Sequence, residues 1–530
     1  MAKLTRAFLL PIATLSLAAP VAVFAQDSAP DKKPVESVDK QHREDVNASA
    51  AQGWASAPVE EREVSSRHSV SVGGRNLAYT ATAGTLTLRT LEGKPTASMF
   101  YVAYTLDGKP AGTRRPVTFL YNGGPGSPSF WLHMGSFAPV RLETGDPVTI
   151  GPPPYRYGPN PQTLLDKTDL VFLDAIGAGY SRPLGDAKPQ DFYGVDQDVN
   201  AFATAIQRYI TRYERWNSPK FVLGESYGTL RSGALAYEMQ QRGMALNGVI
   251  LLSSIMNYGY RQPGLDQVYI NYLPSYAATA WYHNKLPDRP ADVASVVERA
   301  RQFALGPYAS ALAKGQSISP EERRAVAEQL SALTGLSTDF IIRANLRVDL
   351  YRFQKELLRD QRLSVGRFDS RYTGPDSDAA GEGPDSDKSS DAISGAFIAS
   401  FRDYLGRELG YRSDMPYRLS ARDAEGWTWN WQHKAAGGNW PQNNPNTAVD
   451  LAAAMRENPY LKVLSLNGYY DMATPFFGTE NDLGHMMLEP REQQNLVFRY
   501  YHGGHMTYVN PEALAEQKAD IAAFIDSAVR

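Results

Sequence analysis

Short apolar runs recur along the chain, and each ends in a polar or glycine-rich turn. Runs that are apolar at every position are typical of strands covered on both faces, as in a mostly parallel sheet. The predicted strands are residues 117–121, 170–173, 221–223, 249–252, 461–466 and 496–498. Between two of them, apolar residues at steps of three and four from Val195 to Tyr213 predict a helix. This alternation predicts an α/β fold with a mostly parallel central sheet flanked by helices.

A different pattern precedes these runs. Residues 68–72 and 77–82 alternate apolar and polar positions on either side of Gly73 and Gly74, which predicts an N-terminal β-hairpin region. Residues 86–89 and 98–106 predict two further strands.

Between residues 262 and 453 the sheet pattern stops. Helical periodicity is found at residues 296–312, 320–333 and 346–358, and residues 374–391 form a polar stretch rich in Gly, Asp and Ser. Because strands return afterwards, we interpret residues 262–453 as a mainly helical lid inserted over the carboxyl edge of the sheet. A separate domain is the alternative. The core would then comprise residues 64–261 and 454–530.

The first residues have the features of an export signal. Lys3 and Arg6 precede an apolar run, and small residues at positions 23 and 25 fit a cleavage site. A membrane anchor is the alternative, but the run is short for a span and contains two prolines. We therefore predict a signal peptide over residues 1–25, a flexible polar lead-in over residues 26–63, and a periplasmic or secreted protein without a stable membrane anchor.

Composition excludes several functions. The formal net charge is -3, so no basic field is available to attract nucleic acid. The chain has no cysteine, which excludes disulfides, a cysteine nucleophile and a thiolate metal site. Oligomeric state has no signal in the sequence.

The strongest local motif is Gly-Glu-Ser-Tyr-Gly at residues 224–228, of the form G-x-S-x-G. A predicted strand leads into it and a predicted helix, residues 229–241, follows it. A serine on such a strand-to-helix turn is the nucleophile of α/β-hydrolases. The motif therefore predicts an α/β-hydrolase fold with Ser226 as nucleophile.

A serine nucleophile needs a base and an acid that orients the base, in the chain order Ser, Asp, His in this fold. Asp471 follows a late strand, and His505 lies after the last strand behind two glycines. His502 is nearly on that strand, so we expect it to be an ordinary packed or surface residue. A metal site formed by the two histidines is the rival interpretation, but no third ligand lies nearby in the sequence.

An oxyanion hole needs preorganised N–H donors. The backbone N–H of Tyr227, directly after the nucleophile, is one candidate. The loop Asn-Gly-Gly-Pro-Gly at residues 122–126 follows an earlier strand and suits the second donor.

Three ordered motifs resemble the serine carboxypeptidases: residues 122–126, residues 224–228 and Gly-Gly-His-Met at residues 503–506. Asp174, with the glycines and Ser181 after it, also resembles that family's segment ahead of the nucleophile. The resemblance runs from about residue 80 to the C-terminus. It implies removal of single residues from peptide C-termini, commonly at acid pH, without a metal or organic cofactor.

The resemblance also assigns roles to residues. It implies Gly124 and Tyr227 as oxyanion donors, and Asn122, Gly123 and Glu225 as binders of the terminal carboxylate of a peptide substrate. A carboxylate can hydrogen-bond Glu225 only while Glu225 is protonated. Arg231, further along the predicted helix, is a possible charge partner for Glu225.

Two departures from the family matter. Ser127 stands where the family has a cysteine, and Ser136 stands where it has a second glutamate that pairs with the one beside the nucleophile. The sequence therefore leaves open how a terminal carboxylate is recognised, and it gives neither the preferred side chains nor the pH optimum. The alternatives are another activity of the same fold (esterase, acyltransferase or aminopeptidase) and a catalytically silent binding protein.

Four tryptophans, at positions 427, 429, 431 and 440, cluster late in the predicted lid. They either line a pocket for apolar side chains or pack within the lid.

Overall fold

The computed structural model describes residues 57–109, 114–147, 149–424 and 426–529. The predicted signal peptide and residues 26–56 of the predicted lead-in lie outside these ranges. Within them, no helix is both long and apolar enough to cross a membrane.

The described residues form a mixed central sheet of ten strands in the order β1-β2-β3-β7-β4-β9-β10-β13-β14, with β8 pairing with β3. From β7 to β14 every neighbouring pair is parallel. These strands are β4 (Val117–Tyr121), β7 (Asp169–Leu173), β9 (Lys220–Ser226), β10 (Gly248–Ser254), β13 (Lys462–Gly468) and β14 (Leu496–Tyr501). β4, β7 and β10 are buried along their whole length, which explains their uninterrupted apolar sequences.

The N-terminal strands extend one end of the sheet with antiparallel pairs. The predicted hairpin is present, with Val72 opposite Arg75 around the two-glycine turn. Residues 86–89 are not a separate strand, because β2 continues through them without a break. The strands are β1 (Glu63–Val72), β2 (Arg75–Arg89), β3 (Pro95–Leu106) and β8 (Arg182–Pro183).

Helices cover both faces of the sheet, and each face has its own apolar core. One core joins the sheet to α2 (Phe130–Gly135), α11 (Lys388–Arg407) and α15 (Pro511–Ala528). The other joins it to α3 (Val195–Arg212), α4 (Tyr227–Gln241) and α12 (Ala448–Glu457). This layered arrangement and the strand order are those of an α/β-hydrolase, so the predicted fold class is confirmed.

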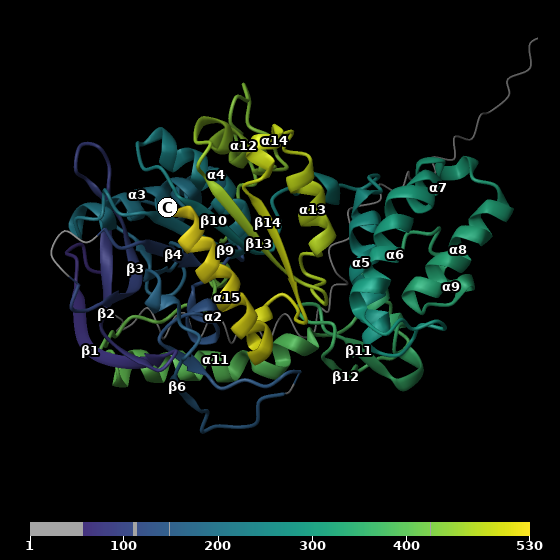
Figure 1. The fold of residues 1–530 in the computed structure, drawn as a ribbon, viewed down its shortest axis with the longest axis horizontal. Helices are drawn as coiled ribbons and strands as arrows, with labels where there is room; N and C mark the ends of the chain where they lie inside the picture. Colours follow the sequence, from purple (N-terminus) through teal and green to yellow (C-terminus); the bar gives the residue numbers. More distant parts are fainter. Residues whose placement is uncertain (1–56, 110–113, 148, 425, 530) are drawn as a thin grey trace, which may run out of the picture. The chain divides into compact units, whose positions relative to one another are not determined.

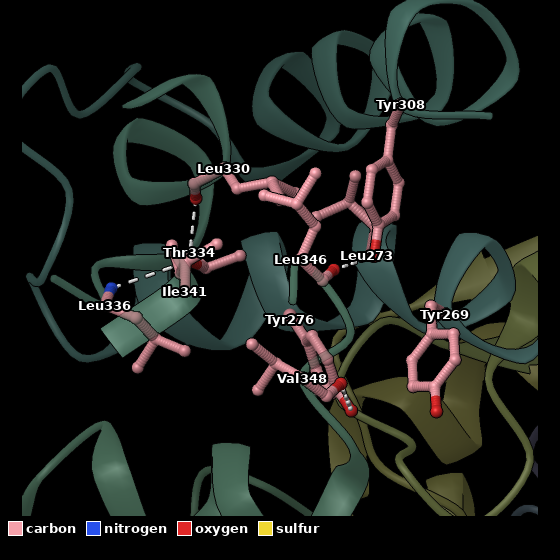
Figure 2. A pocket seen from close by; sticks show the side chains of 10 residues that line it. All are labelled: Tyr269, Leu273, Tyr276, Tyr308, Leu330, Thr334, Leu336, Ile341, Leu346 and Val348. Carbon is pink, nitrogen blue, oxygen red and sulfur yellow. Dashed lines mark hydrogen bonds between the residues drawn. The ribbon is translucent and has the colours of Figure 1, made fainter. Parts of the chain in front are cut away.

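Helices α5 to α9 lie together (Figure 1) and, with α10, share a third apolar core. Figure 2 shows side chains from α5, α8 and α9 around a cavity of about 20 Å³ within it. Tyr470 and Met472, which flank Asp471, are buried in the same core. The helices are α5 (Gln267–Tyr282), α6 (Val293–Phe303), α7 (Ala309–Ala313), α8 (Pro320–Thr334), α9 (Thr338–Arg343) and α10 (Leu350–Glu356).

Shorter elements complete the described chain: β5 (Val140–Leu142), β6 (Tyr157–Pro159), β11 (Leu363–Val365), β12 (Thr373–Pro375), α13 (Phe476–Gly484) and α14 (Pro490–Gln493). Single helical turns add η1 (Leu164–Asp166), η2 (Pro189–Asp191), η3 (Gly259–Arg261), η4 (Ala304–Tyr308), η5 (Gly315–Ser317), η6 (Arg359–Gln361), η7 (Ala421–Asp423) and η8 (Thr507–Val509).

Candidate active site

The predicted nucleophile stands on a sharp turn between a strand and a helix. Ser226 ends β9 with φ 60° and ψ −130°, and α4 begins at the next residue, Tyr227. A positive φ is strained for a residue with a Cβ, and such strain clusters at functional sites. Gly224 allows the turn, because a Cβ there would lie 2.2 Å from Gly228 O. Ser226 is thereby left half-buried at the N-terminus of a helix, where the helix dipole favours developing negative charge.

His505 and Asp471 form a buried pair. Nδ1 of His505 lies 2.9 Å from Oδ2 of Asp471, and the two side chains are 3% and 1% exposed. His502 is exposed, and its ring lies beside Tyr470. The structure thus brings the predicted base and acid together and leaves His502 at the surface.

The loop after β13 fixes the orientation of Asp471. Its Oδ1 accepts hydrogen bonds from the backbone N–H groups of Ala473 (2.8 Å) and Thr474 (2.9 Å), and its Oδ2 accepts one from the Thr474 hydroxyl (2.7 Å). Sequence reasoning did not identify Thr474. A threonine three residues after an aspartate is a local capping pattern that could have indicated it.

Two neighbours anchor the backbone of His505 over the carboxyl ends of the strands. The Ser253 hydroxyl on β10 donates to His505 O at 2.6 Å, and His505 N–H donates to Phe368 O at 2.5 Å. The Phe368 ring stacks on the imidazole with centroids 5.0 Å apart. β10 pairs with β9 as far as Ser254 opposite Ser226, so the histidine loop lies beside the nucleophile.

Within the described residues, the imidazole of His505 has hydrogen bonds to Asp471 and Thr474 but none to Ser226. In free enzymes such catalytic hydrogen bonds are often long and tighten only when substrate binds. Burial lowers the pKa of His505, but the charge and hydrogen bond of Asp471, with the charge of Glu225, outweigh burial and raise that pKa above its ordinary value.

The oxyanion loop lies against the start of α4. A Cβ on Gly123 would be 2.5 Å from Tyr227 N, so only glycine fits there. Gly124 has a φ of 107°, which residues with a Cβ rarely adopt, and its carbonyl accepts a hydrogen bond from Arg422 at 3.1 Å. The N–H groups of Gly124 and Tyr227, the two predicted donors, therefore come from adjoining turns beside Ser226.

A buried ion pair supports this loop. Arg231 on α4 is fully buried, and its Nε lies 2.7 Å from Oδ2 of Asp198. A second guanidinium nitrogen donates to Asn122 O at 2.9 Å. The expectation that Arg231 compensates Glu225 is wrong, because α4 directs the guanidinium toward Asp198 on α3.

Asp174 holds the segment that follows the loop of residues 122–126, at Ser129. Its Oδ1 accepts from Ser129 N at 2.7 Å, and its Oδ2 accepts from the Tyr417 hydroxyl at 3.2 Å. Gly179, with φ 53°, packs so closely that a Cβ on it would lie 1.9 Å from Oδ2 of Asp174. Burial raises the pKa of Asp174 to about 7.

Glu225 is buried below the nucleophile. The Tyr508 hydroxyl donates to its Oε2 at 2.8 Å. Burial raises the pKa of Glu225 to about 7, although the charge of His505 and the side chains of Tyr508 and Asn122 act in the opposite direction. Nothing in the sequence indicated Tyr508, because its position depends on the path of the loop after His505.

The position that lacks the second glutamate forms no hydrogen bond with Glu225 among the described residues. Ser136 is buried, and its hydroxyl donates to Leu132 O at 2.5 Å within the α2 turn. Its neighbour Gly135 packs on Tyr508, since a Cβ there would lie 2.5 Å from the Tyr508 ring. The structure therefore places a tyrosine hydroxyl, rather than a second carboxyl group, on Glu225.

The four tryptophans of the predicted lid differ in their packing and exposure. Trp427 and Trp429 pack against the core between the sheet and α3, and Trp429 and Trp431 lie edge-on to Tyr227, with centroids 5.5 and 6.2 Å from its ring. Trp440 is 74% exposed.

His433 holds the tryptophan segment to the helices behind it. Its Nδ1 lies 2.5 Å from Asp196 on α3, and its Nε2 lies 2.9 Å from Asp450 on α12. Burial lowers the pKa of His433, but the hydrogen bonds and charges of the two aspartates outweigh it and raise that pKa to about 9.

A strained serine at a strand-to-helix turn, a buried His–Asp pair and backbone donors beside the serine define a serine hydrolase of the α/β-hydrolase fold. Residues 76–283 match the model of the family described as serine carboxypeptidase, which confirms the predicted resemblance. No curated protein matches the sequence. In the part of the chain that the structure describes, no group of three or more His, Asp or Glu could hold a metal ion.

Solved structures are similar at low identity. The prohormone-processing carboxypeptidase Kex1(delta)p from Saccharomyces cerevisiae is 12% identical with a TM-score of 0.48, covering 84% of this chain and 91% of that one. A putative aryl esterase from Burkholderia cenocepacia is 12% identical with a TM-score of 0.34 (84% and 99% covered). A proline iminopeptidase from Mycobacterium smegmatis is 13% identical with a TM-score of 0.30 (87% and 98% covered).

Proposed function

We propose that this protein is an exported serine carboxypeptidase that releases C-terminal residues from peptides through an acyl-enzyme. The observation that carries the chemistry is the buried His505–Asp471 pair beside a nucleophile turn. The family match over residues 76–283 supports the choice of peptides as substrates.

In the proposed reaction Ser226 Oγ attacks the scissile carbonyl carbon while His505 Nε2 takes its proton. The oxyanion that forms accepts hydrogen bonds from the N–H groups of Tyr227 and Gly124. Asp471, hydrogen-bonded to Nδ1, orients the imidazole and stabilises the imidazolium. His505 then gives its proton to the leaving amine, the C–N bond breaks, and an acyl-Ser226 ester remains. Water, activated by the same histidine, hydrolyses this ester.

We further propose that, within the predicted insertion of residues 262–453, helices α5 to α10 act as the lid over this site, whereas α11 and α12 pack against the faces of the sheet. Export to the periplasm or outside the cell, with removal of residues 1–25, completes the proposal. The apolar contacts of α5 with the Asp471 loop support a lid that remains attached to the catalytic loops.

Mass spectrometry of a peptide mixture, incubated with the wild type and with Ser226→Ala, tests the function. We expect ladders shortened from the C-terminus, and a loss of about 10⁶-fold in kcat in the variant, the scale seen when a triad serine is removed. Shortening from the N-terminus would instead indicate an aminopeptidase, and turnover of simple esters alone would indicate an esterase. A wild type that a fluorophosphonate probe fails to label would indicate a silent binding protein.

A further inference from the structure

The structure contains a second feature suited to a carboxylate, beside the histidine of the site. A pocket of about 270 Å³ lies between α5, α10 and the segment that precedes Phe368. Two arginines, Arg261 and Arg367, line it together with the rings of Tyr269, Tyr272 and Tyr351 among others.

Each arginine is attached to a neighbour of a triad residue. Arg261 donates to Ala473 O at 3.0 Å, and Ala473 N–H in turn donates to Asp471. Arg367 directly precedes Phe368, whose ring stacks on the imidazole of His505. The pocket therefore lies on the side of the site where His505 and Asp471 stand.

Neither guanidinium has a directly paired carboxylate among the described residues, although the charge of Arg261 acts on the buried carboxyl group of Asp482. Neither forms an ion pair with a carboxylate of that part of the chain, and the buried Nε of Arg261 has no hydrogen-bond partner there. The Arg367 guanidinium lies 5.2 Å from the Phe368 ring centroid. Asp349, the carboxylate that lines the pocket, accepts from Arg352 N and lies 3.5 Å from the Arg352 guanidinium.

The chemistry of the reaction directs the substrate carboxylate to this side. His505 protonates the leaving amine, and in a C-terminal residue the carboxylate carbon is two bonds from that nitrogen. A fork of guanidinium N–H groups matches a carboxylate in shape and charge. The alternative anchor, Glu225, is buried and already bonded to Tyr508.

We propose, on the basis of the proposed carboxypeptidase function, that Arg261 and Arg367 bind the C-terminal carboxylate of the peptide in this pocket. They take the place of the carboxyl pair that the family resemblance implies, which is incomplete here because Ser136 stands at the position of the second glutamate. The protein would then prefer free-acid peptides to amidated ones, and its preference would not depend on a protonated glutamate.

The test measures binding without turnover. In the Ser226→Ala background, calorimetry gives the Kd of one peptide as its free acid and as its C-terminal amide, from pH 6 to 9. We expect tighter binding of the acid at every pH, because a guanidinium stays charged throughout this range. Arg367→Gln should weaken binding of the acid by about 10- to 100-fold, the range for loss of a charge-assisted hydrogen bond, and leave the amide unchanged.

Two variants sharpen the result. Arg367→Lys, which keeps the charge but not the fork, should fall between the wild type and Arg367→Gln. Arg407→Gln removes an arginine whose side chain is 80% exposed on α11 and should change neither Kd. Melting temperatures of all variants check folding.

Equal Kd values for acid and amide would overturn the proposal. So would an acid preference that survives Arg367→Gln but disappears with Glu225→Gln, or that fades as pH rises through 7. If the wild type binds free-acid peptides selectively but releases no C-terminal residues, the result contradicts the proposed function and still supports this carboxylate site.

Discussion

The hydrogen bond from Tyr508 to Glu225 should set the pH at which His505 works as a base. Glu225 carries part of the charge that raises the pKa of His505. Tyr508→Phe removes the 2.8 Å hydrogen bond but keeps the ring that packs on Gly135. The ionised carboxylate then loses a donor, and its pKa must rise further.

The size of the effect follows from the contact. A hydrogen bond to a charged group contributes about 1.5–3 kcal/mol, and about 1.4 kcal/mol corresponds to one pH unit of pKa. The pKa of Glu225, about 7 in the wild type, should therefore reach about 8 to 9. Glu225 would be neutral while His505 titrates, and the pKa of His505 should fall toward its ordinary value.

The assay is the pH dependence of kcat/KM, which reports the free enzyme, on an amidated or ester substrate that carries no carboxylate. The acid limb in Tyr508→Phe should move to lower pH, because His505 loses its proton earlier. Tyr417→Phe is the matched control, since it removes a buried tyrosine donor from a different carboxylate, Asp174. An acid limb that stays in place or moves upward in Tyr508→Phe would refute this coupling.

Three further changes test the packing around the site. In urea unfolding, Gly179→Ala should lower the unfolding free energy by at least about 2 kcal/mol more than Gly73→Ala. Both glycines have φ 53°, but only a Cβ at Gly179 would clash with a carboxylate oxygen. Equal losses of unfolding free energy in the two variants would contradict this clash. Asp198→Asn leaves its arginine partner buried without a counter-charge and should lower the unfolding free energy by about 3–5 kcal/mol; a loss under 1 kcal/mol would show the pair to be dispensable. His433→Gln should lower the unfolding free energy at pH 6 by at most about 3 kcal/mol. The loss should be smaller than the pKa shift alone suggests, because one of the two aspartates is half exposed and solvent screens its charge. The pKa of His433 is raised to about 9, so its stabilisation is complete below about 6.5 and is lost as pH rises through 9; the variant and the wild type should converge by pH 10, and a constant gap would refute the assignment.

Much of the fold follows from the sequence, because strands buried on both faces leave uninterrupted apolar runs. The continuity of β2 was not predictable, because Ala83, Gly84 and Thr85 interrupt the run of larger apolar residues within one long strand. Helix α5 had no signal because it is buried almost all round and therefore shows no periodicity. The sequence does not separate the start of α11 from the polar stretch before it, because the first turn of the helix is Lys-Ser-Ser-Asp.

In the candidate site, too, the sequence predicts some features and misses others. Ser226, Asp471 and His505 were predictable because each follows a strand, and parallel strands bring their carboxyl ends to one edge. The neighbours that shift the pKa values of Glu225 and His505 were not predictable, because Tyr508 lies in the single turn η8 and Arg367 in the loop before Phe368, and the paths of both segments depend on packing. The roles assigned to the site residues remain predictions until the variants above are measured.

The third apolar core has a consequence for how the protein fails on heating. The residues on either side of Asp471 are buried among helices α5 to α10, while Ser226 belongs to the sheet. Proteins open in cooperative units of differing stability. If the helical unit opens first, the acid of the triad goes with it, and activity should disappear several degrees below the melting of the sheet. Amide hydrogen exchange should then be faster in α5 and the Asp471 loop than in β9. Heating would therefore abolish activity at a temperature at which the central sheet is still folded.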